Sequence, residues 1–139
     1  LQHQLISASA LVGGVEPTLA LPRDPATTVV RDASRLNQVV VLRLPVAELS
    51  TRTAAYAADG IIVYSAVCTH TGCTVEHWNS AGYRLVCACH GSEFQAADAA
   101  RVIAGPAPRP LAMLPVKVEQ DRLIVTGAFS RKVGVAQQP

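Results

Sequence analysis

The most informative stretch of the chain is residues 61–92, which read IIVYSAVCTHTGCTVEHWNSAGYRLVCACHGS. Two short segments in it hold all four cysteines and two of the four histidines, namely Cys68-Thr69-His70-Thr71-Gly72-Cys73 and Cys87-Ala88-Cys89-His90-Gly91-Ser92. The β-branched run at 61–67 predicts a buried strand that leads into the first segment. Residues 74–78 and 83–86 flank a turn-forming sequence, which predicts a β-hairpin that brings the two segments together.

Several kinds of site would use these side chains. Two structural disulfides explain an even cysteine count in an exported domain, but they leave His70 and His90 without a role. A tetrahedral zinc site needs four ligands, and the Cys-x-His and Cys-x₂-His pairs fit its usual spacings poorly. A [2Fe–2S] cluster with two thiolates on one iron and two imidazoles on the other needs one Cys and one His from each segment. Cys68 with His70, and Cys87 with His90, meet that need.

At these residues the sequence resembles the Rieske iron–sulfur proteins of cytochrome bc₁ and b₆f complexes. Their two cluster-binding segments read Cys-Thr-His-x-Gly-Cys and Cys-x-Cys-His-Gly-Ser. The likeness extends to Gly105-Pro106-Ala107-Pro108 and to the predicted strands over residues 38–127. It implies an all-β Rieske fold of stacked antiparallel sheets, with a small cluster-binding subdomain at about residues 66–108.

The resemblance also implies a role for each of these side chains. Cys68 and Cys87 would bind one iron of a [2Fe–2S] cluster, and His70 and His90 would bind the other. The two histidines would also take part in the redox reaction itself. Cys73 would pair with Cys89 in a disulfide.

Two further positions bear on the reduction potential of the cluster. In the bc₁ branch a serine hydroxyl donates to a bridging sulfide, and a tyrosine hydroxyl two residues on donates to a cysteine sulfur. Ser92 occupies the first position, whereas Phe94 replaces the tyrosine. Hydrogen bonds around a metal centre tune its potential, so we expect a potential below that of relatives with tyrosine.

The extra cysteine pair implies the disulfide-bearing, high-potential branch of the family, because Rieske ferredoxins and dioxygenases lack it. Disulfides persist in oxidising compartments, so we expect an exported domain on the periplasmic side of the cytoplasmic membrane. Residues 5–14 fit the end of an export signal or membrane anchor, or else an ordinary N-terminal arm. Membrane anchoring would need a segment that this chain does not contain.

The resemblance implies the iron–sulfur subunit of a quinol:cytochrome c oxidoreductase. Its partners would be cytochrome b and a c-type cytochrome or another redox protein, with quinol bound at His70 and His90. The alternative is an electron relay or carrier for a periplasmic oxidase such as arsenite oxidase. The Glu93-Phe94 pair resembles the Rieske subunit of that enzyme. Thr71 and Ala88 stand where bc₁ proteins usually have Leu and Pro. By itself the domain would be an electron carrier rather than a complete enzyme.

Composition limits the chain to a small folded domain. It has 139 residues, 50% of them hydrophobic and 16% charged, which excludes intrinsic disorder. A net charge of +2 without a run of basic residues gives no support for nucleic-acid binding. We expect an N-terminal arm at 1–37, the Rieske domain at 38–127 and a tail at 128–139. His3 and His77 have no predicted role.

The remaining pattern predicts short elements. We expect an irregular lead-in at 15–37, a strand at 38–44, a helical turn at 45–49, a turn at 59–60, a stiff proline loop at 105–110, and a hairpin formed by 116–119 and 122–126.

Overall fold

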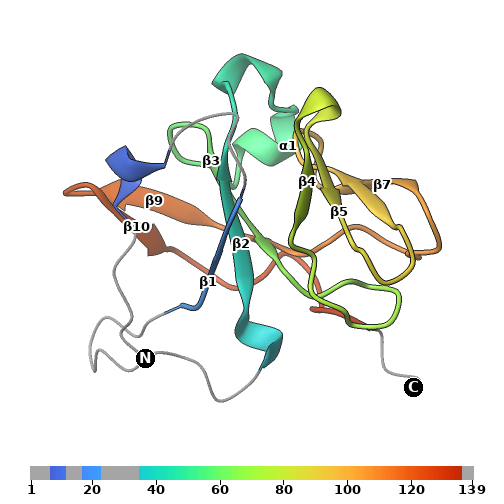
Figure 1. Cartoon of the computed structure of the whole chain (residues 1–139). Helices are drawn as coiled ribbons and strands as arrows, with labels where there is room; N and C mark the ends of the chain where they lie inside the picture. Colours follow the sequence, from blue (N-terminus) through green and yellow to red (C-terminus); the bar gives the residue numbers. More distant parts are fainter. Residues whose placement is uncertain (1–6, 12–16, 23–34, 136–139) are drawn as a thin grey trace.

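Three antiparallel sheets build the fold in residues 7–11, 17–22 and 35–135, the part of the chain that this computed structural model describes (Figure 1). The first sheet has the order β1-β2-β3-β8, with β1 (Thr18–Ala20), β2 (Val39–Arg43), β3 (Ile61–Ser65) and β8 (Met113–Leu114). The second pairs β9 (Val116–Glu119) with β10 (Arg122–Val125). The third has the order β4-β5-β6-β7, with β4 (His77–Asn79), β5 (Arg84–Val86), β6 (Glu93–Gln95) and β7 (Arg101–Ala104). The predicted all-β class is confirmed.

The helical segments are short and connect strands. They are α1 (Thr51–Ala54) and the 3-10 turns η1 (Ala8–Ala10), η2 (Arg35–Asn37), η3 (Val46–Glu48) and η4 (Ser80–Gly82). The helical turn predicted at 45–49 is therefore confirmed as η3. In the described residues, no helix has both the length and the apolar character that crossing a membrane requires.

β2 and β3 lie at the centre of the first sheet and are buried on both faces. Their register pairs Val40 with Tyr64. Because successive side chains point to opposite faces of a strand, these two residues join one hydrophobic cluster, and their neighbours one position along join a second. Burial on both faces explains why each strand reads as an unbroken apolar run. The first cluster also contains Cys68 and Cys87, so the predicted site is continuous with the core.

The turn predicted before β3 is confirmed at Asp59-Gly60, where both residues have positive φ angles of 51° and 79°. A Cβ on Gly60 would lie 2.2 Å from the carbonyl oxygen of Leu44. The Leu44 amide in turn donates to the Gly60 carbonyl at 2.9 Å. Glycine is therefore needed here both for the left-handed backbone and for the close approach of the end of β2.

The predicted irregular lead-in at 15–37 is wrong in one place, since β1 lies within it. Leu19 pairs with Val40 of β2, so this short strand covers an edge of the first sheet. Three residues are too few to show a period of two, and the pairing is set by the free edge of β2. Residues 1–6, 12–16 and 23–34 lie outside the described part of the chain, and with them His3 and half of the proposed export segment.

Hydrogen bonds join the first sheet to the segment between β6 and β7. The buried hydroxyl of Tyr64 donates to the carbonyl of Ala96 at 2.6 Å. The hydroxyl of Thr53 accepts from the amide of Ala99 at 2.7 Å. Burial is the main reason why the pKa of Tyr64 lies well above its usual value, so the hydroxyl keeps its proton and remains a donor. These contacts fix the third sheet, which carries one of the two cysteine segments, against the first.

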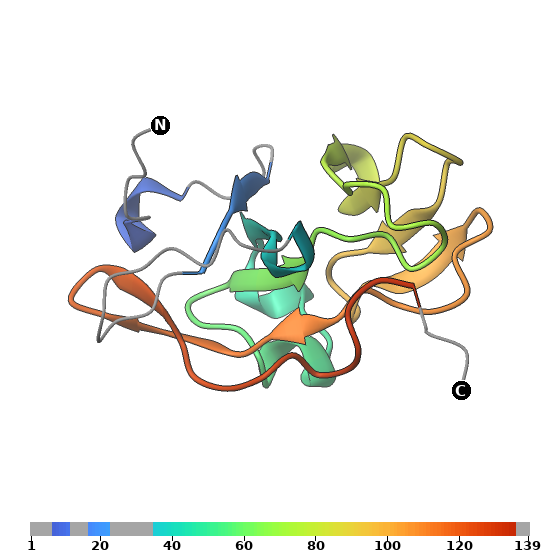
Figure 2. The same cartoon turned by 90° about the horizontal axis from the view of Figure 1, so that it is seen from below.

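The chain after β10 returns to the body of the protein instead of extending as a free tail. The amide of Ser130 donates to the carbonyl of Met113 at 2.8 Å, and its hydroxyl accepts from the amide of Met113 at 2.9 Å. Viewed from below, this segment, in red, runs from the β9–β10 hairpin toward the cysteine segments along the rear of the molecule (Figure 2).

Candidate metal centre

The first cysteine segment is a compact loop that follows β3. The amide of Gly72 donates to the carbonyl of Cys68 at 3.0 Å, and the amide of Cys68 donates to the carbonyl of Cys73 at 2.8 Å. Gly72 has a φ of 82°, which a residue with a side chain rarely adopts. We call residues 68–73 the first loop.

The second cysteine segment follows β5 and has the same hydrogen-bond pattern. The amide of Gly91 donates to the carbonyl of Cys87 at 2.9 Å, and the amide of Cys87 donates to the carbonyl of Ser92 at 2.9 Å. Gly91 has a φ of 77°. We call residues 87–92 the second loop. The matching positions of Cys and Gly in the two sequences thus produce matching backbone turns.

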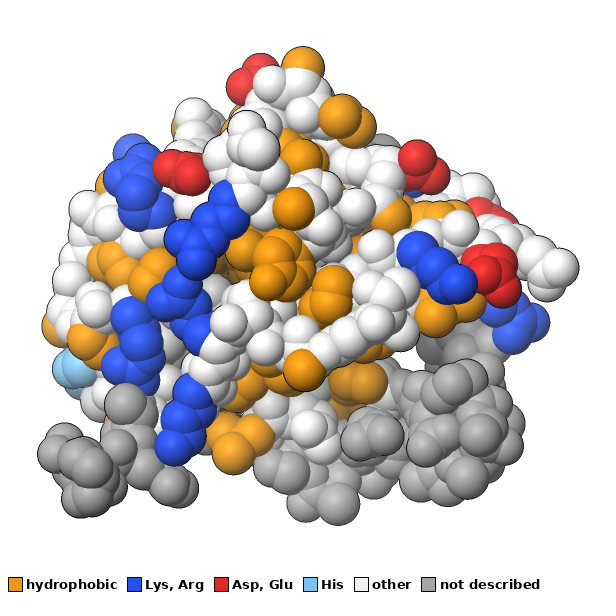
Figure 3. Space-filling view, turned by 180° about the vertical axis from the view of Figure 1, so that it is seen from behind, with side chains coloured by type: hydrophobic (Ala, Val, Ile, Leu, Met, Phe, Trp, Pro, Cys, Tyr) orange, Lys and Arg blue, Asp and Glu red, His pale blue; other side chains and the backbone are white. Residues whose placement is uncertain are grey.

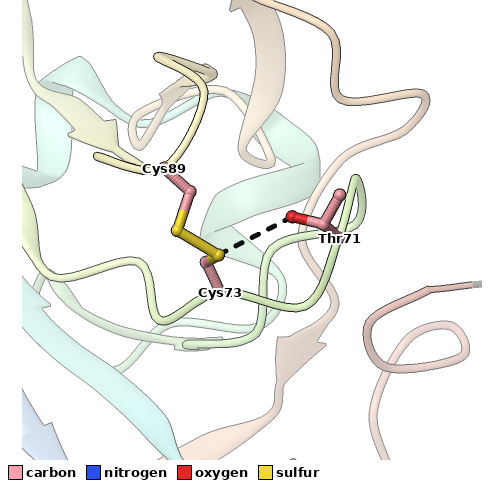
Figure 4. Close-up of a disulfide and its surroundings, with 3 residues drawn as sticks. All are labelled: Thr71, Cys73 and Cys89. Carbon is pink, nitrogen blue, oxygen red and sulfur yellow. Dashed lines mark hydrogen bonds between the residues drawn. A yellow bond between two sulfur atoms is a disulfide. The ribbon is translucent and has the colours of Figure 1, made fainter.

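A disulfide between Cys73 and Cys89 joins the two loops, as the resemblance implies (Figure 4). The Cα atoms are 6.5 Å apart, within the usual range for a disulfide. The sulfur of Cys87 lies within 4.8 Å of both disulfide sulfurs. On the outer side, the exposed hydroxyl of Thr71 donates to the sulfur of Cys73 at 3.6 Å, since a disulfide sulfur carries no proton.

Cys68 and Cys87 are free thiols, and both are buried. Burial raises the pKa of Cys87, and the neighbouring sulfur of Cys68 raises it further. The backbone amides of Cys89 and His90 donate to this sulfur and act in the opposite direction. Without a cation nearby this raised pKa favours the protonated form of Cys87, whereas a bound metal ion deprotonates a coordinating thiol outright.

His70 and His90 lie on the same two loops as these thiols, and their rings face each other. Their ring centroids are 4.7 Å apart, and the rings meet edge to face at 82°. The Nδ1 atom of His70 is buried and makes no hydrogen bond, although buried ring nitrogens normally have a partner. Since a ring nitrogen is a common metal ligand, coordination would explain this atom.

The proline loop packs against both cysteine loops. The hydroxyl of Thr69 in the first loop donates to the carbonyl of Arg109 at 2.7 Å. The amide of Ala107 donates to the hydroxyl oxygen of Ser92 in the second loop at 3.1 Å. A Cβ on Gly105 would lie 2.4 Å from the Cα of Ser92, so the two backbones pack directly against each other. Because Ser92 uses its oxygen as an acceptor here, its proton is available to another acceptor.

Phe94 lies beneath the second loop. It is fully buried on β6, opposite Leu85 of β5. It belongs to the same hydrophobic cluster as Cys68 and Cys87. Its ring therefore excludes water from the base of the site but offers no hydrogen-bond donor to the sulfurs.

The structure excludes the interpretation of the four cysteines as two structural disulfides. Cys73 and Cys89 form one disulfide, whereas Cys68 and Cys87 stay free. What remains is a set of two buried thiols and two imidazoles, one of which has an unpartnered Nδ1. That donor set fits a cluster with sulfur ligands on one iron and nitrogen ligands on the other.

The fold and the donor set define an iron–sulfur protein rather than a disulfide-only domain. Residues 21–116 match the Rieske [2Fe-2S] domain family, and the chain belongs to that family. Its cofactor is accordingly a [2Fe–2S] cluster.

Similar proteins are found among respiratory complexes. The cytochrome bc1 complex Rieske iron-sulfur subunit of Streptomyces lividans is 36% identical over 100 residues, which are 70% of this chain and 59% of that protein. The putative respiratory nitrate reductase subunit Rieske of Haloferax mediterranei is 44% identical over 80 residues, 57% of this chain and 36% of that protein. The chain thus spans less than two thirds of the length of these curated relatives.

One solved structure shows the likeness of the fold. The soluble domain of the Rieske protein II (soxF) from Sulfolobus acidocaldarius superposes with a TM-score of 0.60. The superposition covers 87% of this chain and 72% of that one, at 19% sequence identity.

Sequence reasoning missed the contacts that hold the proline loop. Thr69 and Arg109 are far apart in the sequence, and their bond joins a hydroxyl to a backbone carbonyl, which leaves no sequence pattern. The one feature of the sequence that could have indicated this contact is the position of Thr69 between Cys68 and His70. His77, which had no predicted role, is exposed on β4.

Thr69→Val should loosen the proline loop. The substitution keeps the shape of the side chain but removes the donor to the Arg109 carbonyl. This loss should lower the free energy of unfolding by about 1–3 kcal/mol. We expect lower stability to thermal unfolding and faster loss of the visible absorbance of the cluster in the presence of a chelator.

Thr74→Val is the matched control, because the hydroxyl of Thr74 makes no hydrogen bond in the described residues. It should change both measurements little. Equal rates of cluster loss in the two variants would contradict the structural role of Thr69.

Proposed function

We propose that the chain carries electrons through its [2Fe–2S] cluster as the iron–sulfur subunit of a quinol:cytochrome c oxidoreductase. Cys68 and Cys87 would hold one iron, and His70 and His90 the other. The observation that carries this proposal is the pair of facing imidazoles on the same two loops as two buried free thiols, with the Nδ1 of His70 buried and unpartnered.

When bound, such a cluster takes up and releases one electron, and its two neutral imidazole ligands make reduction easier than in an all-cysteine cluster. The protein supplies the surroundings. Phe94 and the proline loop exclude water from one side, while the disulfide holds the two loops together. His90 is exposed, so a quinol could reach its ring and pass a proton to it as an electron leaves. Quinol oxidation requires both transfers.

The proposed partners are cytochrome b and a c-type cytochrome. The Streptomyces lividans relative supports this, because its name places it in a cytochrome bc1 complex. The proposed location is the outer side of the cytoplasmic membrane. The Cys73–Cys89 disulfide supports it, since such bonds persist in oxidising compartments.

An electron relay to another respiratory enzyme is the second candidate. It is favoured by the Haloferax mediterranei relative, whose name refers to a respiratory nitrate reductase. Thr71 agrees with either candidate, since an exposed hydroxyl at this position makes the tip of the first loop polar.

Purification of the full protein from its native membranes distinguishes these two candidates. A quinol-oxidising complex should bring b-type haem with it, detected by its absorption spectrum after dithionite reduction. Co-purification of another respiratory oxidoreductase without b-type haem would instead support the relay.

His70→Ala should remove a cluster ligand. We expect loss of the reddish-brown colour and of the electron paramagnetic resonance signal of the reduced protein. His77→Ala is the matched control, because His77 is exposed on β4 and lies outside the two loops. An unchanged signal in His70→Ala would overturn the proposed ligand set, and a colourless wild-type protein that contains zinc would overturn the proposed function.

Phe94→Tyr should raise the reduction potential. A tyrosine hydroxyl that donates to a cysteine sulfur stabilises the reduced cluster, which carries more negative charge. An extra stabilisation of about 1 kcal/mol corresponds to a rise on the order of 40 mV for a one-electron couple. Protein-film voltammetry measures this change.

Phe94→Leu is the control, because it changes the packing without adding a donor, and it should shift the potential less. Thermal unfolding of both variants checks that the buried site accepts each side chain. A lower or unchanged potential in a folded Phe94→Tyr protein would show that no such hydrogen bond tunes the cluster.

A further inference from the structure

The C-terminal segment lies beside the first loop. A Cβ on Gly134 would lie 3.0 Å from the Cγ1 of Val67, the residue before Cys68. The guanidinium of Arg109 donates to the Gly134 carbonyl at 2.8 Å. This contact places Arg109 between the C-terminal segment and the first loop, where Thr69 donates to its carbonyl. Gly134 therefore lies beside the residue that precedes the first loop.

Two further cations belong to this segment, Arg131 and Lys132. Neither these side chains nor that of Arg109 takes part in the ion pairs found among the described residues, which are Arg84–Glu93, Arg101–Asp98 and Lys117–Glu119. The Nε atom of Arg131 is buried and has no hydrogen-bond partner. Among the residues that the structure describes, these three cations therefore have no acidic partner.

Positive charge gathers on the rear of the molecule. Lys and Arg side chains form a column on this side, next to apolar side chains, and no acidic side chain is visible in the lower part of the column (Figure 3). The C-terminal segment runs along the same side (Figure 2). A surface with one sign of charge attracts partners of the opposite sign over a distance of about 10 Å at ordinary salt.

Apolar side chains lie next to these cations. Val135 is 47% exposed and follows Gly134 directly, and Leu36 is 49% exposed. A Cβ on Gly134 would lie 3.7 Å from the Cδ2 of Leu36, so both apolar side chains lie beside the same glycine. Exposed apolar groups with a charged rim are typical of protein-binding surfaces. A small anion would need no such groups.

We propose that Arg109, Arg131, Lys132, Leu36 and Val135 form a basic docking face for an acidic electron-transfer protein. This inference rests on the proposed function and names the kind of partner. A protein bound there covers the proline loop and the flank of the first loop. One electron would pass from this protein to the ferric haem of its partner, which becomes ferrous, without the formation of a bond.

Two forms of one haem protein test the proposal. Cytochrome c is basic, and its succinylated form is acidic with the same haem. We expect isothermal titration at an ionic strength of about 10 mM to show binding of the succinylated form and little binding of the native form, with the affinity lost at about 200 mM. Binding is measured with the oxidised protein, so it is read independently of electron transfer.

Arg131→Gln combined with Lys132→Gln removes two charges from the docking face. We expect affinity for succinylated cytochrome c to fall roughly tenfold. Arg52→Gln combined with Arg122→Gln is the matched control, because it removes the same net charge from exposed residues on α1 and β10. It should weaken binding by less than about twofold. Lys132→Glu, at an exposed position, gives a second test if loss of Arg131 unfolds the protein.

Stopped-flow oxidation of the reduced protein supplies a second measurement. Succinylated cytochrome c should be reduced faster than native cytochrome c, and the docking-face variant should lose that preference. An equal loss in both double variants would show a net-charge effect and overturn the proposal. Binding to vesicles of phosphatidylglycerol, without binding to the acidic cytochrome, would overturn it in favour of a membrane surface. A protein that binds the acidic cytochrome but has no cluster signal would overturn the proposed function alone.

Discussion

The disulfide between Cys73 and Cys89 is the constraint on which the site depends. It joins the two cysteine loops covalently, across a sequence separation of 16 residues. A crosslink of this length restricts the unfolded chain and stabilises the folded state by about 3 kcal/mol. It also holds together the two loops that carry the free thiols and the two imidazoles.

The site is as rigid as the core beneath it. Cys68 and Cys87 lie in the hydrophobic cluster that contains Tyr64 and Phe94, so the thiols have the packing of interior residues. The histidines lie further out, with His70 half-buried and His90 exposed. One side of the donor set is therefore held in a dry environment while the other meets solvent.

The sequence was most informative where structure is local. The paired loops, the β9–β10 hairpin and the Asp59-Gly60 turn depend on neighbouring residues, and all were predicted. β1 and β8 were missed because strands of two or three residues show no period, and a distant partner decides their pairing. The anchoring of the proline loop was missed for the same reason, since Thr69 meets a backbone carbonyl far along the chain.

The distribution of charge on the surface was also not predictable from the sequence, because it depends on contacts between distant residues. The sequence shows basic residues spread along the chain and a net charge of only +2. Folding pairs several of them with acidic neighbours and brings Arg109 to the C-terminal segment. A modest net charge thus becomes a local positive face beside the first loop. The contact that brings Arg109 there joins a guanidinium to a backbone carbonyl 25 residues along the chain, and such a contact leaves no pattern in the sequence.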